Sequence, residues 1–330
     1  MTKKKLTRGI DEEFAKAFKQ SELFTLYKKN KKELFLGVRN NYLNLYYNCD
    51  SVAKIDYKKE EIICQTSKNY LHGTNIRNHI NISPRDICKN YAIITENIAK
   101  RSTPEKKAQS KLVILNNLNK NSKWFCIDVE WAKAFENKQQ KDDADFNARF
   151  DIIAISKENN HKVALIELKY GRQAIGGYSG IYRHIENFNK YRKKRYFNSH
   201  KKEIIDIIKN QKMLGVNVPV ELQNLENKWK NPKAKDINYN FYVITLDNNG
   251  ETPQHSTPKQ TMAAYLFKRK RWGCKELSPG PKVEEKFGDV TKKSNKKQLQ
   301  VTFLFSKQTL KKLNINDVIY GNYDDKEIPQ

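Results

Sequence analysis

Acidic residues are scarce in this sequence relative to basic ones. Its 330 residues include 63 Lys and Arg against 37 Asp and Glu, which gives a formal net charge of +26. This excess is too large for an evenly balanced solvated surface, and it indicates an anionic polymer as the partner. Aromatic residues make up 11% of the chain and apolar residues 38%, which excludes a disordered basic tail, because such tails lack the side chains that build a core.

Cysteine pairs and long apolar runs are also missing. The five cysteines are widely separated, odd in number and never in a CxxC pair, which excludes a disulfide framework and a thiolate zinc site. No stretch approaches the roughly 18 apolar residues of a membrane span, and no apolar segment follows the basic opening MTKKKLTRGIDEEF. We therefore expect a cytoplasmic protein that is neither exported nor embedded in a membrane.

The first third of the chain has two recognisable patterns. A short helix is predicted near residues 11–20, and alternating apolar and polar residues over 34–64 predict a small antiparallel meander around the turn pair Asn40-Asn41. Three roles stay open for this meander: it could bind the target, form a homodimer or cap the core.

Helices and strands then follow in a definite order. Ser83-Pro84 is a helix-start signal, and residues 84–119 predict two helices divided at Ser102-Thr103-Pro104. Ser179 is a suitable N-cap for a further helix with apolar residues at steps of three or four. Strands are predicted in four apolar runs rich in β-branched residues, at 123–132, 149–157, 162–170 and 240–247.

This order predicts a mixed α/β (α+β) fold. Its core, over about 104–247, reads helix, three strands, helix, strand. The tail from 250 carries Pro, Gly and Lys clusters and one credible strand, QLQVTFLFS. We expect three parts: an N-terminal helix and meander at 1–83, the core at 84–250 and a basic C-terminal extension at 251–330.

Two acids and a lysine lie inside the most apolar strands. Asp151 begins one predicted strand, and Glu167-Leu168-Lys169 ends the next one. Because side chains alternate along a strand, Glu167 and Lys169 share a face, and in an antiparallel hairpin Asp151 can approach that face. An unpaired carboxylate is costly to bury there. Such oxygen ligands suit Mg²⁺, although a structural ion pair is the alternative interpretation.

Here the chain resembles the PD-(D/E)XK superfamily of metal-dependent nucleases, which has the restriction-endonuclease-like αβββαβ fold with a mixed central sheet. That family has an acid at the start of the second core strand and Glu-x-Lys on the third, as Asp151, Glu167 and Lys169 stand here. Phe150 occupies the place of the signature proline, which many members also lack. The resemblance implies that Asp151, Glu167 and the Leu168 carbonyl hold Mg²⁺ or Mn²⁺, and that Lys169 positions the attacking water.

A further acid is expected upstream in members of this family. Asp128 and Glu130 share a face of the first core strand by alternation, and Glu130 is the favoured candidate. Exposed charges at the end of that strand are the alternative interpretation.

Basic residues that could contact phosphates cluster after Lys169. Arg183 is a candidate phosphate contact, Gln173 and His184 could face the cleft, and His184 could equally be a helix residue with a local partner. From Lys190 to Lys202 the chain has seven basic residues and no acid, which predicts a continued helix that follows a phosphate backbone. The predicted nucleic-acid contacts are Gln173, Arg183, Lys190, Arg192, Lys193, Lys194, Arg195, Arg269 and Arg271.

These observations favour a Mg²⁺-dependent phosphodiesterase that hydrolyses nucleic acid, DNA more than RNA, with bacterial restriction or phage defence among the compatible roles. The alternative is a nuclease-like fold that binds nucleic acid without cleaving it. An RNA-processing or ribosome-associated protein would explain the charge equally well, but it would explain the acids in apolar strands poorly.

Overall fold

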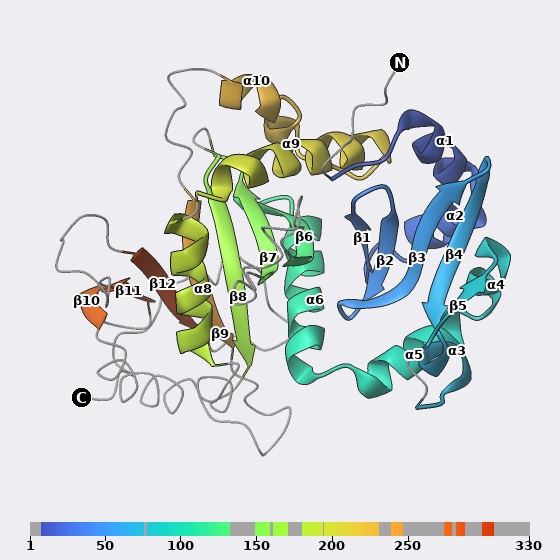
Figure 1. Ribbon diagram of the computed structural model, residues 1–330, viewed down its shortest axis with the longest axis horizontal. Coiled ribbons are helices and arrows are strands. Elements are labelled where there is room, and N and C mark those ends of the chain that lie inside the picture. The colour runs from blue at the N-terminus through green and yellow to red at the C-terminus, as the bar shows by residue number, and fades with distance from the viewer. Residues whose placement is uncertain are drawn as a thin grey trace. The chain divides into compact units, whose positions relative to one another are not determined.

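The computed structural model has a mixed α/β fold with one antiparallel and one mixed sheet (Figure 1). It describes residues 8–75, 78–132, 149–158, 161–170, 180–193, 195–230, 239–246, 274–278, 282–287 and 299–306. The chain forms two compact units, residues 1–118 with 199–235 and residues 119–198 with 236–330. In the part of the chain that is described, no helix is long and apolar enough to cross a membrane.

The first unit is built on an antiparallel sheet in the order β1-β2-β3-β4-β5. Its strands are β1 (Leu34–Val38), β2 (Leu43–Tyr47), β3 (Asp50–Lys58), β4 (Glu61–Ser67) and β5 (His79–Ile82). The predicted meander is therefore confirmed, and β5 extends it by one strand. Asn41 adopts a positive φ of 57° in the first turn, a conformation that asparagine tolerates better than most residues.

The first unit also contains helices, and the start of one follows the signal expected at Ser83-Pro84. They are α1 (Glu12–Gln20), α2 (Glu22–Lys29), α3 (Lys68–His72), α4 (Pro84–Lys89), α5 (Tyr91–Arg101), α6 (Pro104–Leu118), α9 (Phe197–Met213), the short η2 (Val220–Leu222) and α10 (Leu225–Lys230). Ser83 caps α4 by accepting a hydrogen bond from the Asp86 N–H. The break at residues 102–103 is confirmed, but a second break at Asn90 was not expected. The Asn90 side-chain amide donates to the Asp86 carbonyl and ends α4 there.

The second unit is built on a mixed sheet in the order β10-β11-β12-β9-β8-β7-β6. Its strands are β6 (Trp124–Ala132), β7 (Arg149–Ser156), β8 (Val163–Tyr170), β9 (Tyr239–Leu246), β10 (Cys274–Ser278), β11 (Lys282–Phe287) and β12 (Leu299–Ser306). The β6, β7 and β8 strands are antiparallel neighbours, whereas β9 runs parallel to both β8 and β12. All five strands expected in this unit are present, and β10 and β11 are additional.

An aromatic cluster holds helix α8 (Ile181–Lys193) against one face of this sheet (Figure 1). Phe150 of β7 stacks on Trp131 of β6 and on Phe188 of α8, with ring centroids 5.3 and 5.8 Å apart. Phe188 in turn stacks on Phe241 of β9 at 4.6 Å, and Tyr191 packs edge-on against Phe150. Phe150 is fully buried, so its place directly before Asp151 has a packing explanation.

Replacing Phe150 with alanine is therefore expected to remove a central ring of the second unit. Truncation of a buried phenylalanine lowers the free energy of unfolding by about 3–5 kcal/mol. Urea unfolding of Phe150→Ala would measure this loss. Tyr182→Ala is the matched control, because Tyr182 is an aromatic residue of α8 with 44% of its surface exposed. Equal losses in the two variants would contradict the assignment of Phe150 to the core.

Candidate active site

The β7–β8 hairpin brings Asp151 to the end of the neighbouring strand. The register pairs Ile152 with Ile166 in an antiparallel ladder. Directly beyond this pair, the Leu168 N–H donates to the Asp151 carboxylate at 2.7 Å. The N–H and C=O of a strand residue point to the same neighbouring strand, so the Leu168 carbonyl faces the Asp151 side as well. The expected approach of Asp151 to the Glu-x-Lys segment is present in the structure.

Glu167 and Lys169 lie on one face of β8 and contact each other directly. The Lys169 Nζ is 2.6 Å from the Glu167 Oε1. Lys169 is only 6% exposed and Glu167 only 2% exposed. Leu168 between them is also buried. A charged pair on a buried strand loses hydration, and only a close, well-aligned contact offsets this loss. The hydrogen bond between Lys169 and Glu167 is such a contact.

His184 of α8 completes the contacts of the same carboxylate oxygen. Its Nε2 lies 3.0 Å from the Glu167 Oε1. Sequence reasoning left His184 between two interpretations and did not include it among the site residues. A signal was present, because His184 follows Ile181 by three residues and precedes Phe188 by four, which places it on the helix face that packs against the sheet.

The second oxygen of Glu167 has no comparable contact. Glu167 Oε2 is buried and accepts no hydrogen bond from any residue that the structure describes. Buried carboxylate oxygens are nearly always hydrogen-bonded or bound to a cation, because an unsatisfied one is costly. Together with Asp151 and the Leu168 carbonyl, this oxygen offers the hard ligands that Mg²⁺ or Mn²⁺ accepts. The residues therefore fit a divalent cation.

Asp151 is the electrostatically perturbed group of this site. Burial raises its pKa well above the ordinary value, and the negative charges of Glu167 and Glu130 raise it further. The Lys169 ammonium and the hydrogen bond from the Leu168 N–H lower this pKa, but they do not compensate for burial. The site thus concentrates negative charge away from water, which favours binding of a proton or a cation.

Glu130 acts on this site through its charge, from an irregular part of β6. The register of β6 against β7 shifts between Cys126 and Asp128, and Glu130 has a positive φ of 52°. Asp128 is fully buried, and its carboxylate accepts a hydrogen bond from the Val129 N–H, so the interpretation as an exposed charge is wrong for Asp128. Across the described ranges, no three Asp, Glu, His or Cys side chains are gathered to hold a metal ion.

The predicted nucleic-acid contacts are only partly described. Gln173, Lys194, Arg269 and Arg271 lie outside the described residues. Arg183 forms an ion pair with Glu186 at 3.0 Å, which offsets its charge. Lys190, Arg192 and Lys193 form the last turn of α8, where cations also stabilise the helix dipole.

The basic run from Lys190 to Lys202 does not form one continued helix, so that expectation is wrong. Helix α8 ends at Lys193, and α9 begins only at Phe197. Arg195 lies in the turn between them with a positive φ of 52°. The left-handed backbone at Arg195 breaks the helical path, so the basic residues are divided between two helices and a turn.

The raised pKa of Asp151 predicts a pH-dependent gain in stability when its charge is removed. In the unfolded chain an aspartate titrates near pH 4, so the folded protein binds this proton more tightly and loses stability as the pH rises from there toward the raised pKa. Asp151→Asn keeps the acceptor for the Leu168 N–H and removes the charge. We expect its melting temperature at pH 7, in EDTA, to exceed the parent value by about 2–4 °C.

The difference in melting temperature between Asp151→Asn and the parent should shrink as the pH falls toward 4. Thermal unfolding followed by circular dichroism across that range measures this difference. Glu158→Gln, at the other end of the same hairpin and 45% exposed in its side chain, is the control and should show no such trend. An Asp151→Asn protein less stable than the parent at pH 7, by an amount independent of pH, would contradict this electrostatic account.

Comparison with known proteins adds no assignment to this geometry. No protein-family model, curated protein or solved structure matches the chain. The functional interpretation of the hairpin therefore rests on its own residues and on the physical chemistry of their arrangement.

Proposed function

We propose that this protein is a Mg²⁺-dependent nuclease that hydrolyses phosphodiester bonds, with DNA as the favoured substrate. The observation that carries the proposal is the convergence of Asp151, Glu167 and Lys169 at one end of the β7–β8 hairpin, with a buried oxygen of Glu167 left without a partner among the described residues. An acid at the start of one strand followed by Glu-x-Lys on the next is the feature through which the chain resembles PD-(D/E)XK nucleases.

The arrangement of the second unit supports the same proposal. Three antiparallel strands, β6, β7 and β8, are followed by α8 and, after the added helices α9, η2 and α10, by β9 parallel to β8. This is the order of strands and helix that the restriction-endonuclease-like fold requires, and α6 precedes it in the chain. Asp151 lies at the start of the second strand of this series and Glu167 near the end of the third, as the resemblance implies.

Each side chain has a definite task in this proposal. Lys169 and His184 hold one oxygen of Glu167, and its other oxygen would hold a cation together with the Asp151 carboxylate. Bound Mg²⁺ would supply Lewis acidity toward the phosphate and a lowered pKa of the attacking water. Lys169 orients that water and offsets charge developing on the phosphorus oxygens. The water attacks phosphorus in line with the 3′-oxygen, which leaves with a proton, and the product carries a 5′-phosphate.

The net charge of the chain supports a polyanionic substrate. The excess of 26 positive charges would attract nucleic acid at long range and make the binding affinity sensitive to salt concentration. Lys193 and Arg195 are exposed near the end of α8, the helix whose beginning carries His184 to the site. A phosphate backbone that follows α8 would thus reach the hairpin.

Cleavage assays on plasmid, linear DNA and RNA test this function. With Mg²⁺ the parent protein should cleave nucleic acid, and EDTA should abolish cleavage. Asp151→Asn, Glu167→Gln and Lys169→Met should each reduce the rate at least about 100-fold, since each removes a group that acts in the transition state. Glu158→Gln, which changes an acid outside the site, should keep the parent rate.

Binding measured on the same samples separates the alternatives. Tight binding of nucleic acid without cleavage under any metal condition would favour a non-catalytic binding module. Cleavage that persists in all three site variants would place the active site elsewhere in the chain. Circular dichroism spectra equal to that of the parent show that a variant has folded, so that loss of activity is not loss of structure.

A further inference from the structure

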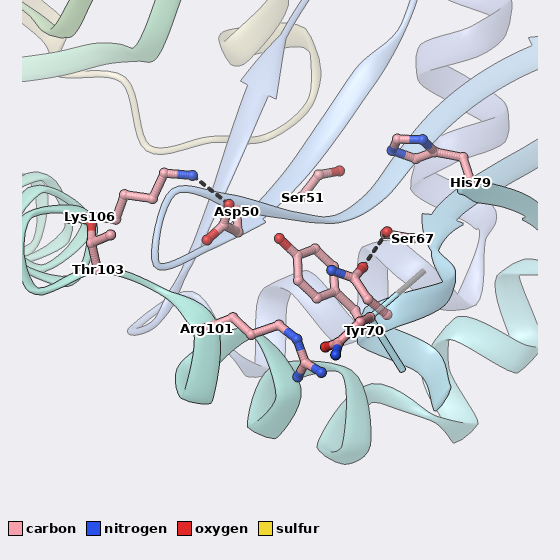
Figure 2. Close-up of a pocket in the computed structure, with 10 residues that line it drawn as sticks. Asp50, Ser51, Ser67, Tyr70, His79, Arg101, Thr103 and Lys106 are labelled. Carbon is pink, nitrogen blue, oxygen red and sulfur yellow. Dashed lines mark hydrogen bonds and ion pairs between the residues drawn. The ribbon is translucent and has the colours of Figure 1, made fainter. Parts of the chain in front are cut away.

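The first unit contains a pocket that the proposed nuclease site does not use. Its volume is about 720 Å³, and it lies among β3, β4, β5, α3 and the ends of α5 and α6. Figure 2 shows Tyr70 near its centre, with Asp50 and Lys106 on one side and Ser67 and His79 on the other. Further hydroxyl and amide side chains and the Arg101 guanidinium complete the lining.

Every lining residue carries a polar group. Pockets for drug-like ligands are mostly apolar with a few polar groups that orient the ligand. A lining of hydroxyls, amides, an imidazole and three charged groups instead favours a ligand with several polar groups. The chemistry of that ligand depends on how the three charges are balanced.

The single carboxylate of the lining is neutralised by its neighbours. Asp50 Oδ1 is 2.6 Å from the Lys106 Nζ, and Asp50 Oδ2 accepts a hydrogen bond from the Ser102 hydroxyl at 3.0 Å. Asp50 also lies close enough to the Tyr70 hydroxyl to raise its pKa. With these partners, Asp50 contributes little net negative charge to the pocket, and it holds the Lys106 ammonium at the pocket wall.

The charge of Arg101, in contrast, is not neutralised. Its guanidinium donates to the carbonyls of Gly73 and Thr74, at 2.9 and 3.3 Å, and to the Asn97 carbonyl at 3.3 Å. These acceptors carry no net charge, and no carboxylate in the described part of the chain forms an ion pair with Arg101. The carbonyls therefore fix the guanidinium in place and leave its positive charge available to an anion.

Both cations act at the centre of the pocket. Burial is the main cause that raises the pKa of the Tyr70 hydroxyl, and Asp50 raises it further, whereas Lys106 and Arg101 lower it. The positive charges thus reach the Tyr70 oxygen from two helices, α5 and α6. Apart from His79, the charged side chains of the lining sum to +1, from two cations and one anion.

From this geometry we propose that the pocket binds a phosphate group, carried by a free nucleotide or by a nucleic-acid chain. Hydroxyl and amide donors together with fixed cations are the groups that bind phosphate oxygens in proteins, and the polar lining accommodates the sugar and base attached to that phosphate. The proposal concerns the first unit and does not rest on cleavage at the hairpin.

The test uses the full chain in EDTA, so that metal-dependent cleavage does not interfere. Calorimetric titrations with inorganic phosphate, adenosine 5′-monophosphate and adenosine show whether a phosphate is required, and fluorescence anisotropy with a short single-stranded DNA tests the polymer. Lys106→Gln and Arg101→Gln remove cations of the lining. Asp50→Asn removes the anion and keeps an acceptor for Ser102. Lys100→Gln is the matched control, because Lys100 precedes Arg101 on α5 and pairs with Glu96 outside the pocket.

Opposite shifts in affinity are the expected result. Lys106→Gln and Arg101→Gln should weaken binding of the phosphate-bearing probe about two- to fivefold, Asp50→Asn should strengthen it by a similar factor, and Lys100→Gln should have no effect on the small probes. A gain of affinity in Asp50→Asn cannot arise from misfolding. Shifts seen with inorganic phosphate and the nucleotide identify a free ligand, and shifts seen only with DNA identify a phosphate of the polymer.

Two results would overturn the proposal. One is equal affinity of every probe for the parent, Asp50→Asn and Lys106→Gln proteins. The other is a shift in the same direction for Asp50→Asn and Lys106→Gln. The hairpin variant Asp151→Asn should leave binding of the nucleotide unchanged, so failure of this proposal and failure of the nuclease proposal give different results.

Discussion

The second unit depends on one buried carboxylate. Glu167 lies on a central strand with its Oε1 held by Lys169 and His184, while Asp151 is fixed beside it by the Leu168 N–H. The two acids lose hydration and repel each other, which is why the pKa of Asp151 is raised. The fold tolerates them because a lysine, a histidine and a backbone N–H lie within contact distance. A protein that needed only stability would place apolar side chains here.

Aromatic packing beneath α8 supplies the stability that this cluster costs. Phe150, directly before Asp151, is at the centre of the aromatic cluster that joins β6, β7, β9 and α8. Neighbouring residues of β7 thus have different tasks: Phe150 packs in the core, and Asp151 bonds to the β8 backbone in the site. The same helix that Phe188 anchors to the sheet also carries His184 to Glu167. Packing and site geometry are therefore coupled through α8.

Local patterns in the sequence were enough to predict the core strands and the approach of Asp151 to Glu167 and Lys169, because strand alternation and hairpin pairing are short-range rules. The contact of His184 with Glu167 was not predictable in the same way, since it depends on how α8 packs on the sheet. The positive φ values of Glu130 and Arg195 leave no signal in residue type, so the irregular β6 and the break after α8 were not foreseen. Strands β10 and β11, with the sequences CKELS and KVEEKF, lack the apolar runs that marked the central strands.

The most direct measurement of the central claim is the position of a bound divalent cation. Crystals of the protein grown with Mn²⁺ allow an anomalous difference map at the manganese absorption edge. The account predicts a peak at the Asp151 and Glu167 carboxylates, next to the Leu168 carbonyl, and its absence in crystals of Glu167→Gln. A well-ordered hairpin without a peak, or a peak unchanged by Glu167→Gln, would contradict it.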